Sequence, residues 1–144
     1  MLIIEKSFSF QPFIDLQKPE ININDIIQRI EEYIHEKTRK TIIDGQPVHV
    51  LNISGLADYH HNELANYLRS NRCDCNVESG EFGETPIKHC WIKINDLLID
   101  LTIKQFENCP NCAPSYLRQF FDTHCYVSNN SESLIYKLYR KTDD

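Results

Sequence analysis

The residues of this sequence best placed to do chemistry are His89 and Asp100, which lie on either side of a turn at Asn95-Asp96. A two-residue turn between two aliphatic, β-branched runs predicts a β-hairpin, with strands over about residues 88–94 and 97–103. The two side chains are then diagonal neighbours, roughly 7–8 Å apart at the backbone, a gap that long side chains bridge. An aspartate that accepts a hydrogen bond from an imidazole fixes its tautomer and stabilises its charged form, as a base that activates a thiol requires.

Alternation along the hairpin divides its residues between two faces. Trp91 and Thr102 share the face of His89 and Asp100. The other face carries aliphatic side chains, those of Ile92, Ile94, Leu97 and Ile99. A second interpretation fits the same pattern, because a histidine and an aspartate opposite a packed face can simply be solvated.

The hairpin also carries a family resemblance. His89-Cys90-Trp91, followed by Asp100, Thr102 and Gln105-Phe106 in the pattern Asp-x-Thr-x-x-Gln-Phe, resembles bacterial papain-like and transglutaminase-like proteins. That superfamily comprises cysteine proteases, glutamine deamidases and transglutaminases, several of them bacterial effectors or toxins. The resemblance covers roughly residues 50–106 and implies an α+β fold, in which the helix that carries the nucleophile packs on a small antiparallel sheet. It implies that His89 is the base and Asp100 the residue that orients it.

The family's nucleophile is a cysteine at the start of a helix upstream of the histidine. There the helix dipole and the free N–H groups lower the thiol pKa and hold an oxyanion. The matching stretch is Gly55-Leu56-Ala57, with Ala57 at the nucleophile position, and no cysteine precedes Cys73. Three explanations remain open. Ala57 replaces a cysteine in an inactivated thiol enzyme, or the chain is a natural pseudoenzyme that only binds, or Ala57 is merely a good helix former.

Other residues near this stretch have both a functional and a structural interpretation. By the resemblance, Asn52 is a candidate oxyanion donor, although it also suits a turn before the helix. His61 lies one turn beyond Ala57 on the same helical face and is a candidate for the substrate groove, although a solvated position is expected for it. Trp91 is the other candidate beside the substrate, or a packing residue that shields the His–Asp pair.

The remaining cysteines leave several alternatives. Cys90 follows His89 in a strand, and Cys125 follows His124, so each thiol points away from its neighbouring imidazole. Four thiolates could bind structural zinc in a small interaction domain, although the C-x-C half is irregular for a zinc ribbon. These four are Cys73, Cys75, Cys109 and Cys112. C-x-x-C is also a redox spacing, and buried, unligated cysteines are the default expectation. No other cofactor is expected.

Further elements must hold the hairpin in place. Apolar residues at helical spacing predict a helix from Asn24 to about Lys40, and a second helix is predicted from about Leu56 to Ser70. Residues 73–86 contain polar and turn-forming residues and are expected to be a loop. We also expect a helix after Pro114 and a strand over residues 134–139.

Length and charge limit the class of protein. A chain of 144 residues is expected to form a single domain over residues 1–144. The net charge of −6 argues against nucleic acid and favours a protein or peptide substrate with basic patches. No apolar run approaches the ~20 residues of a membrane span, and the first residues do not resemble a cleavable signal. We therefore expect a cytoplasmic protein, or one exported without a cleavable signal.

Overall fold

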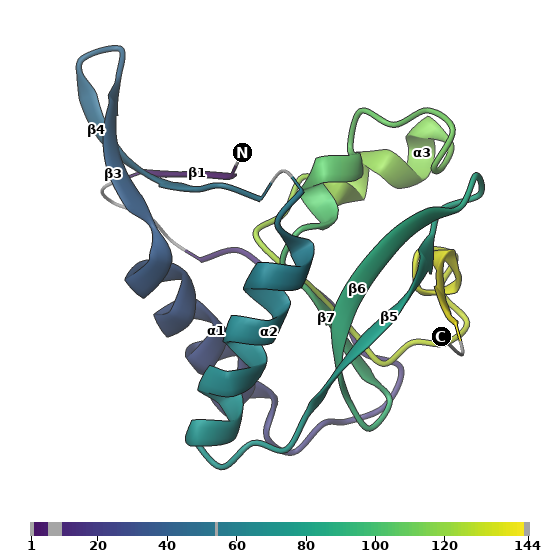
Figure 1. Ribbon diagram of the computed structural model, residues 1–144. Helices are drawn as coiled ribbons and strands as arrows, with labels where there is room; N and C mark the ends of the chain where they lie inside the picture. The colour runs from purple at the N-terminus through teal and green to yellow at the C-terminus, as the bar shows by residue number, and fades with distance from the viewer. Residues whose placement is uncertain (1, 6–9, 54, 143–144) are drawn as a thin grey trace.

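The computed structural model describes residues 2–5, 10–53 and 55–142 and contains two β-sheets with helices around the larger one (Figure 1). In chain order the elements are β1 (Leu2–Glu5), β2 (Phe13–Asp15), α1 (Ile23–Lys37), β3 (Arg39–Ile43), β4 (Gln46–Leu51), α2 (Ala57–Ser70), β5 (Asn76–Phe82), β6 (Ile87–Ile94), β7 (Leu97–Asp100), η1 (Ile103–Phe106), α3 (Ser115–Arg118), η2 (Gln119–Phe121), β8 (Tyr126–Ser128), η3 (Tyr136–Leu138) and β9 (Tyr139–Lys141), where η marks a 3₁₀-helix. The expected α+β class is confirmed.

The six-stranded sheet has the order β2-β8-β7-β6-β5-β9 and is antiparallel except where β2 runs parallel to β8. Helices α1 and α2 pack against one face of this sheet (Figure 1). Their buried residues, including Ile30, Ile34 and Leu64, meet the aliphatic face of the β6–β7 hairpin. This first core is therefore the one that helical periodicity and strand alternation predict together.

A second core covers the opposite face of the sheet. It is formed by residues of the strands β5 to β9 and of the short helical segments that follow β7, and six of its thirteen buried residues are aromatic. Trp91 and Phe82 lie at its centre and are almost fully buried. The face that carries His89 and Asp100 is thus buried, and the interpretation of that face as solvated is wrong.

Three of the elements predicted from the sequence differ in the structure. Residues 76–82, expected to be a loop, form β5, which pairs with β6 along its whole length. The second hairpin strand ends at Asp100 and gives way to the 3₁₀-helix η1. The strand expected over 134–139 begins only at Tyr139, after η3.

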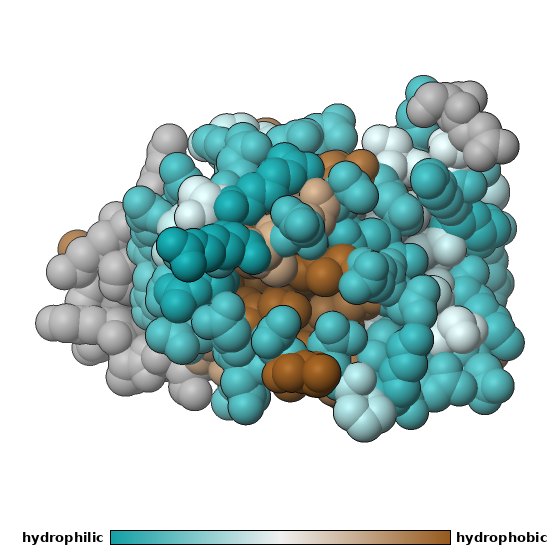
Figure 2. All heavy atoms as spheres, turned by 90° about the horizontal axis from the view of Figure 1, so that it is seen from below, coloured by the Kyte–Doolittle hydropathy of each residue, from teal (hydrophilic) through white to brown (hydrophobic). Residues whose placement is uncertain are grey.

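The three-stranded sheet, in the order β1-β4-β3, stands to one side, and the β3–β4 hairpin extends away from the larger sheet (Figure 1). On the lower face of the molecule, apolar side chains reach the surface with polar ones around them (Figure 2). Within the described ranges, no helix combines the length and the apolar character needed to cross a membrane.

Candidate active site

The β6–β7 hairpin brings His89 and Asp100 into direct contact, as its register predicts. Ile92 pairs with Ile99 and Ile94 with Leu97 around the turn. Nε2 of His89 lies 2.8 Å from Oδ2 of Asp100, and both side chains are buried. Because a carboxylate can only accept, Nε2 carries the proton, and Nδ1 is the basic nitrogen of the neutral ring. Within the described part of the chain Nδ1 makes no hydrogen bond.

The carboxylate of Asp100 is buried but surrounded by donors. Oδ2 accepts from His89 and, at 2.7 Å, from the hydroxyl of Tyr139. Oδ1 accepts from the backbone N–H of Thr102 at 2.8 Å and from its hydroxyl at 3.2 Å. Burial alone would raise the pKa of Asp100, but the attraction of a protonated His89 or His61 and the hydrogen bond from His89 outweigh it and hold that pKa well below its usual range. Asp100 is therefore ionised and fixed in position.

The rest of the Asp-x-Thr-x-x-Gln-Phe pattern also contributes to this arrangement. Thr102 bonds Asp100 as above, and Nε2 of Gln105 donates to the hydroxyl of Thr102 at 2.9 Å. Phe106 meets the ring of His89 edge-on, with 5.0 Å between the ring centroids, and stacks on Phe82. Gln105 and Phe106 belong to η1, which begins directly after Thr102. This short helix therefore places both side chains close to the His89–Asp100 pair.

A cavity of about 580 Å³ lies where the start of α2 faces β6. Ala57, the first residue of α2, lines it together with His89, Gln105 and Phe106. Leu56, the N-cap residue of α2, makes no side-chain cap hydrogen bond. Ala57, at the start of α2, and His89 therefore line the same cavity.

His61 fixes the end of the hairpin against α2. Its Nε2 accepts from the backbone N–H of Leu101 at 2.9 Å, so the ring proton is on Nδ1, which donates to the carbonyl of Ala57 at 2.9 Å. The lone pair on Nε2 is occupied by that amide, so its 3.5 Å approach to Oδ1 of Asp100 is not a hydrogen bond. His61 thus ties Ala57 to the strand end that carries Asp100.

Cys90 is the one free cysteine in the described residues that lines the cavity, and it is not an activated nucleophile. Its sulfur lies 3.7 Å from Nδ1 of His61, but that nitrogen carries the ring proton and cannot accept another. Burial, followed by the hydrogen bond and charge of Asp58, raises the pKa of the Cys90 thiol. As predicted from the strand alternation, Cys90 points away from His89.

Three predicted site residues do not line the cavity. Trp91 and His61 are almost fully buried and do not line the cavity, so neither forms a substrate groove; Trp91 packs beside the dyad instead. The expectation that His61 is solvated is also wrong. Asn52 is exposed and does not line the cavity either, while its carbonyl accepts from His60 at 2.7 Å.

Two residues of the site carried no local signal in the sequence. Tyr139 reaches Asp100 from β9, at the far end of the chain, and burial together with the charge of Asp100 raises its pKa, so it remains a donor. Gly80 faces His89 across the β5–β6 ladder and lies against Trp91 and the backbone of Arg140. Only the pairing of distant strands brings either residue to the site.

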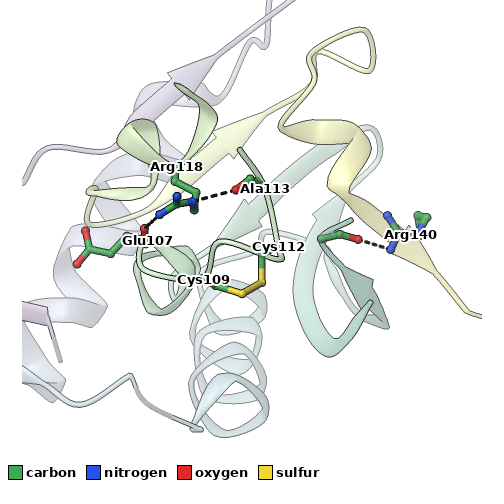
Figure 3. The surroundings of a disulfide bond; sticks show 7 residues. Glu107, Cys109, Cys112, Ala113, Arg118 and Arg140 are labelled. Carbon is green, nitrogen blue, oxygen red and sulfur yellow. Dashed lines mark hydrogen bonds between the residues drawn. A yellow bond between two sulfur atoms is a disulfide. The ribbon is translucent and has the colours of Figure 1, made fainter. Parts of the chain in front are cut away.

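The cysteines do not form a zinc site in the described part of the chain. Cys109 and Cys112 are joined by a disulfide (Figure 3), and no cluster of metal-binding side chains is present among the residues described. The four-thiolate alternative is therefore not supported. Arg118 donates to the carbonyls of Ala113 and Glu107 and so joins the two ends of the disulfide loop.

Reduction of the Cys109–Cys112 disulfide is expected to lower the free energy of unfolding by about 2 kcal/mol at most, because the bond closes a very short loop. Urea unfolding of the same protein with and without a dithiol reductant measures the difference. A Cys109→Ser/Cys112→Ala variant is the control, since it should not respond to the reductant. If the free energy of unfolding fell by much more than about 2 kcal/mol, the disulfide would also stabilise parts of the fold outside its own loop.

Comparison of the chain with protein-family models, with curated proteins and with solved structures finds no match. The function must therefore be argued from the geometry of the site.

Proposed function

We propose that this chain has the scaffold of a papain-like or transglutaminase-like thiol enzyme, which acts on peptide or glutamine amide bonds by acyl transfer. The observation that carries the proposal is the His89–Asp100 pair beside a cavity that both His89 and Ala57 line. In the chain as given, Ala57 occupies the position of the nucleophile.

The chemistry follows from the positions of these groups. A thiol at position 57 would lie at the start of a helix, where the dipole and the free N–H groups favour the thiolate. His89 would take the thiol proton on Nδ1 while Asp100 holds Nε2–H and balances the imidazolium charge. The thiolate would attack the amide carbonyl, the oxyanion would be held by the N–H groups of α2, and the imidazolium would protonate the leaving amine. Water or an amine would then release the acyl group.

The second candidate is a binding module that keeps the cavity and does no chemistry. The observation that favours it is Ala57 itself, since an alanine methyl cannot form an acyl-enzyme and the described thiol nearest the site, Cys90, has no base. Under this alternative the protein binds an amide-bearing peptide in the same cavity without turning it over.

Restoring the thiol separates the two candidates. The Ala57→Cys variant is expected to react with iodoacetamide at about pH 5.5 roughly 100-fold faster than an ordinary cysteine, because an ion pair with His89 keeps the thiolate populated there. The rate is measured from about pH 5 to about pH 9, with the chain as given as the baseline. The native thiols of Cys73, Cys75, Cys90 and Cys125 contribute little at low pH, since burial raises the pKa of each.

The control is the double variant Ala57→Cys/His89→Asn, in which the advantage at low pH should disappear. An introduced thiol that labels no faster than an ordinary cysteine would reject the thiol-enzyme proposal and leave the binding module.

A further inference from the structure

The proposed function makes no use of the segment Cys109-Pro110-Asn111-Cys112, which the structure closes into a disulfide (Figure 3). We propose that this disulfide is a thiol–disulfide exchange site, at which small external thiols attack Cys109, and that its opening releases the β5–β6 turn beside the cavity. The exchange site is separate from the His89–Asp100 pair and needs no thiol at position 57. It therefore holds or fails independently of the proposed function.

The two sulfurs of the disulfide differ in their access to solvent. Cys112 is fully buried in the second core, whereas Cys109 is half-buried and lies between two exposed residues, Asn108 and Pro110. An external thiolate must reach the sulfur that it attacks, so it attacks Cys109. Exchange therefore has one direction, in which Cys109 is the attacked group and Cys112 the leaving group.

The exchange transfers two electrons and two protons from a dithiol to the protein. A thiolate of the dithiol attacks Sγ of Cys109, an S–S bond forms between them, and the bond to Cys112 breaks. Cys112 takes up a proton as it leaves. The second thiolate of the dithiol then attacks its own sulfur in the mixed disulfide, which oxidises the dithiol and releases Cys109 as a thiol.

Each half of the disulfide is attached to a different segment that lines the cavity. The N–H of Cys109 donates to the carbonyl of Phe106 at 3.1 Å, so this half is fixed to the end of η1. The carbonyl of Cys112 accepts from the N–H of Glu84 at 2.7 Å, in the turn that leads into β6. The S–S bond thus joins the segment that carries Phe106 to the one that carries His89, and both residues line the cavity.

The β5–β6 turn is held from two sides. On the side of the disulfide loop, Thr85 donates to the carbonyl of Asn111 at 3.0 Å, and a Cβ added to Gly83 would lie 3.1 Å from Cα of Cys112. On the other side, the N–H of Gly83 donates to the carbonyl of Leu138 at 3.0 Å. Reduction frees the loop but not the segment of Leu138, so it should weaken the first attachment alone.

Two single variants test which sulfur exchanges, with glutathione disulfide as the probe and mass spectrometry as the readout. The probe transfers one glutathione to a free cysteine and releases the other as a thiol. Cys112→Ala leaves Cys109 free and is expected to form the mixed disulfide at least about 10-fold faster than Cys109→Ala, in which only the buried sulfur remains. Equal rates in the two variants, or no exchange in Cys112→Ala, would overturn the assignment of Cys109.

Hydrogen exchange of the parent chain, before and after reduction with dithiothreitol, tests the release of the turn. The amides of Glu84 and Thr85 are expected to exchange at least about 5-fold faster after reduction, because their acceptors lie in the freed loop. The amide of Gly83 is the matched control, since its acceptor lies outside the loop and its rate should change by less than about 2-fold. Cys109→Ser/Cys112→Ala should resemble the reduced parent with or without the reductant. Unchanged rates at Glu84 and Thr85, or equal acceleration of all three amides, would overturn the proposal.

Discussion

Replacing Asp100 with alanine is expected to lower the free energy of unfolding by about 3–5 kcal/mol. The carboxylate is buried and accepts from His89, Tyr139 and Thr102, so its removal leaves several buried donors without a partner. Urea unfolding followed by the fluorescence of Trp91, which lies in the same core, measures the loss.

The matched control is Asp96→Ala in the turn of the same hairpin. Asp96 forms an ion pair with Lys18, and both side chains are largely exposed, so this change should have a much smaller effect. Similar losses for the two variants would contradict the assignment of Asp100 as the centre of a buried network.

The Asp100→Asn variant tests the charge separately through the dependence of stability on pH. The pKa of Asp100 in the folded protein lies below its value of about 3.9 in the unfolded chain. Its ionisation therefore stabilises the fold above about pH 4, and this contribution is lost as the pH falls further. We expect the stability advantage of the parent protein over Asp100→Asn to be present at neutral pH and to shrink below about pH 4. An advantage that does not change with pH would show that packing alone is lost in the variant.

The sequence predicted the hairpin because its signals are local. The turn at Asn95-Asp96 fixes the register, and alternation then places His89 and Asp100 on one face. The start of α2 within one residue of Leu56 was likewise predicted from the apolar spacing of the helix. Gln105 could be linked to the site through the family resemblance, although its bond to Thr102 required the structure.

The roles of His61 and β5 could not be predicted for physical reasons. A histidine in a polar stretch of helix looks solvated. The pairing of β6 with β7 ends at Ile99, so the backbone N–H of Leu101 donates to His61 instead of to a neighbouring strand. The residues of β5 include Gly80 and two glutamates, types with weak strand propensity, and it is pairing on both sides that makes them a strand. Long-range contacts outweigh local preference in both cases.

Gly80 has the other large expected effect, and Gly80→Ala should lower the free energy of unfolding by about 3 kcal/mol or more. A Cβ at this position would lie 2.1 Å from the backbone oxygen of Arg140 and 2.7 Å from the ring of Trp91. A backbone atom cannot turn aside as a side chain does, so β9 must move off β5. Tyr139 would then lose both its burial and its hydrogen bond to Asp100, and these two losses together account for about 3 kcal/mol of unfolding free energy.

Urea unfolding measures this loss, and Gly45→Ala is the control. Gly45 has a positive φ of 77° but no atom within 4 Å of an added Cβ, so that change should cost only the backbone strain, about 1 kcal/mol. Hydrogen exchange of the amide of Thr142, which donates to the carbonyl of Ser79, reports on β9 directly and should accelerate in Gly80→Ala alone. Unchanged protection of that amide, together with a stability equal to that of the parent, would mean that β9 does not pack against Gly80 and that Tyr139 does not orient Asp100 from this strand.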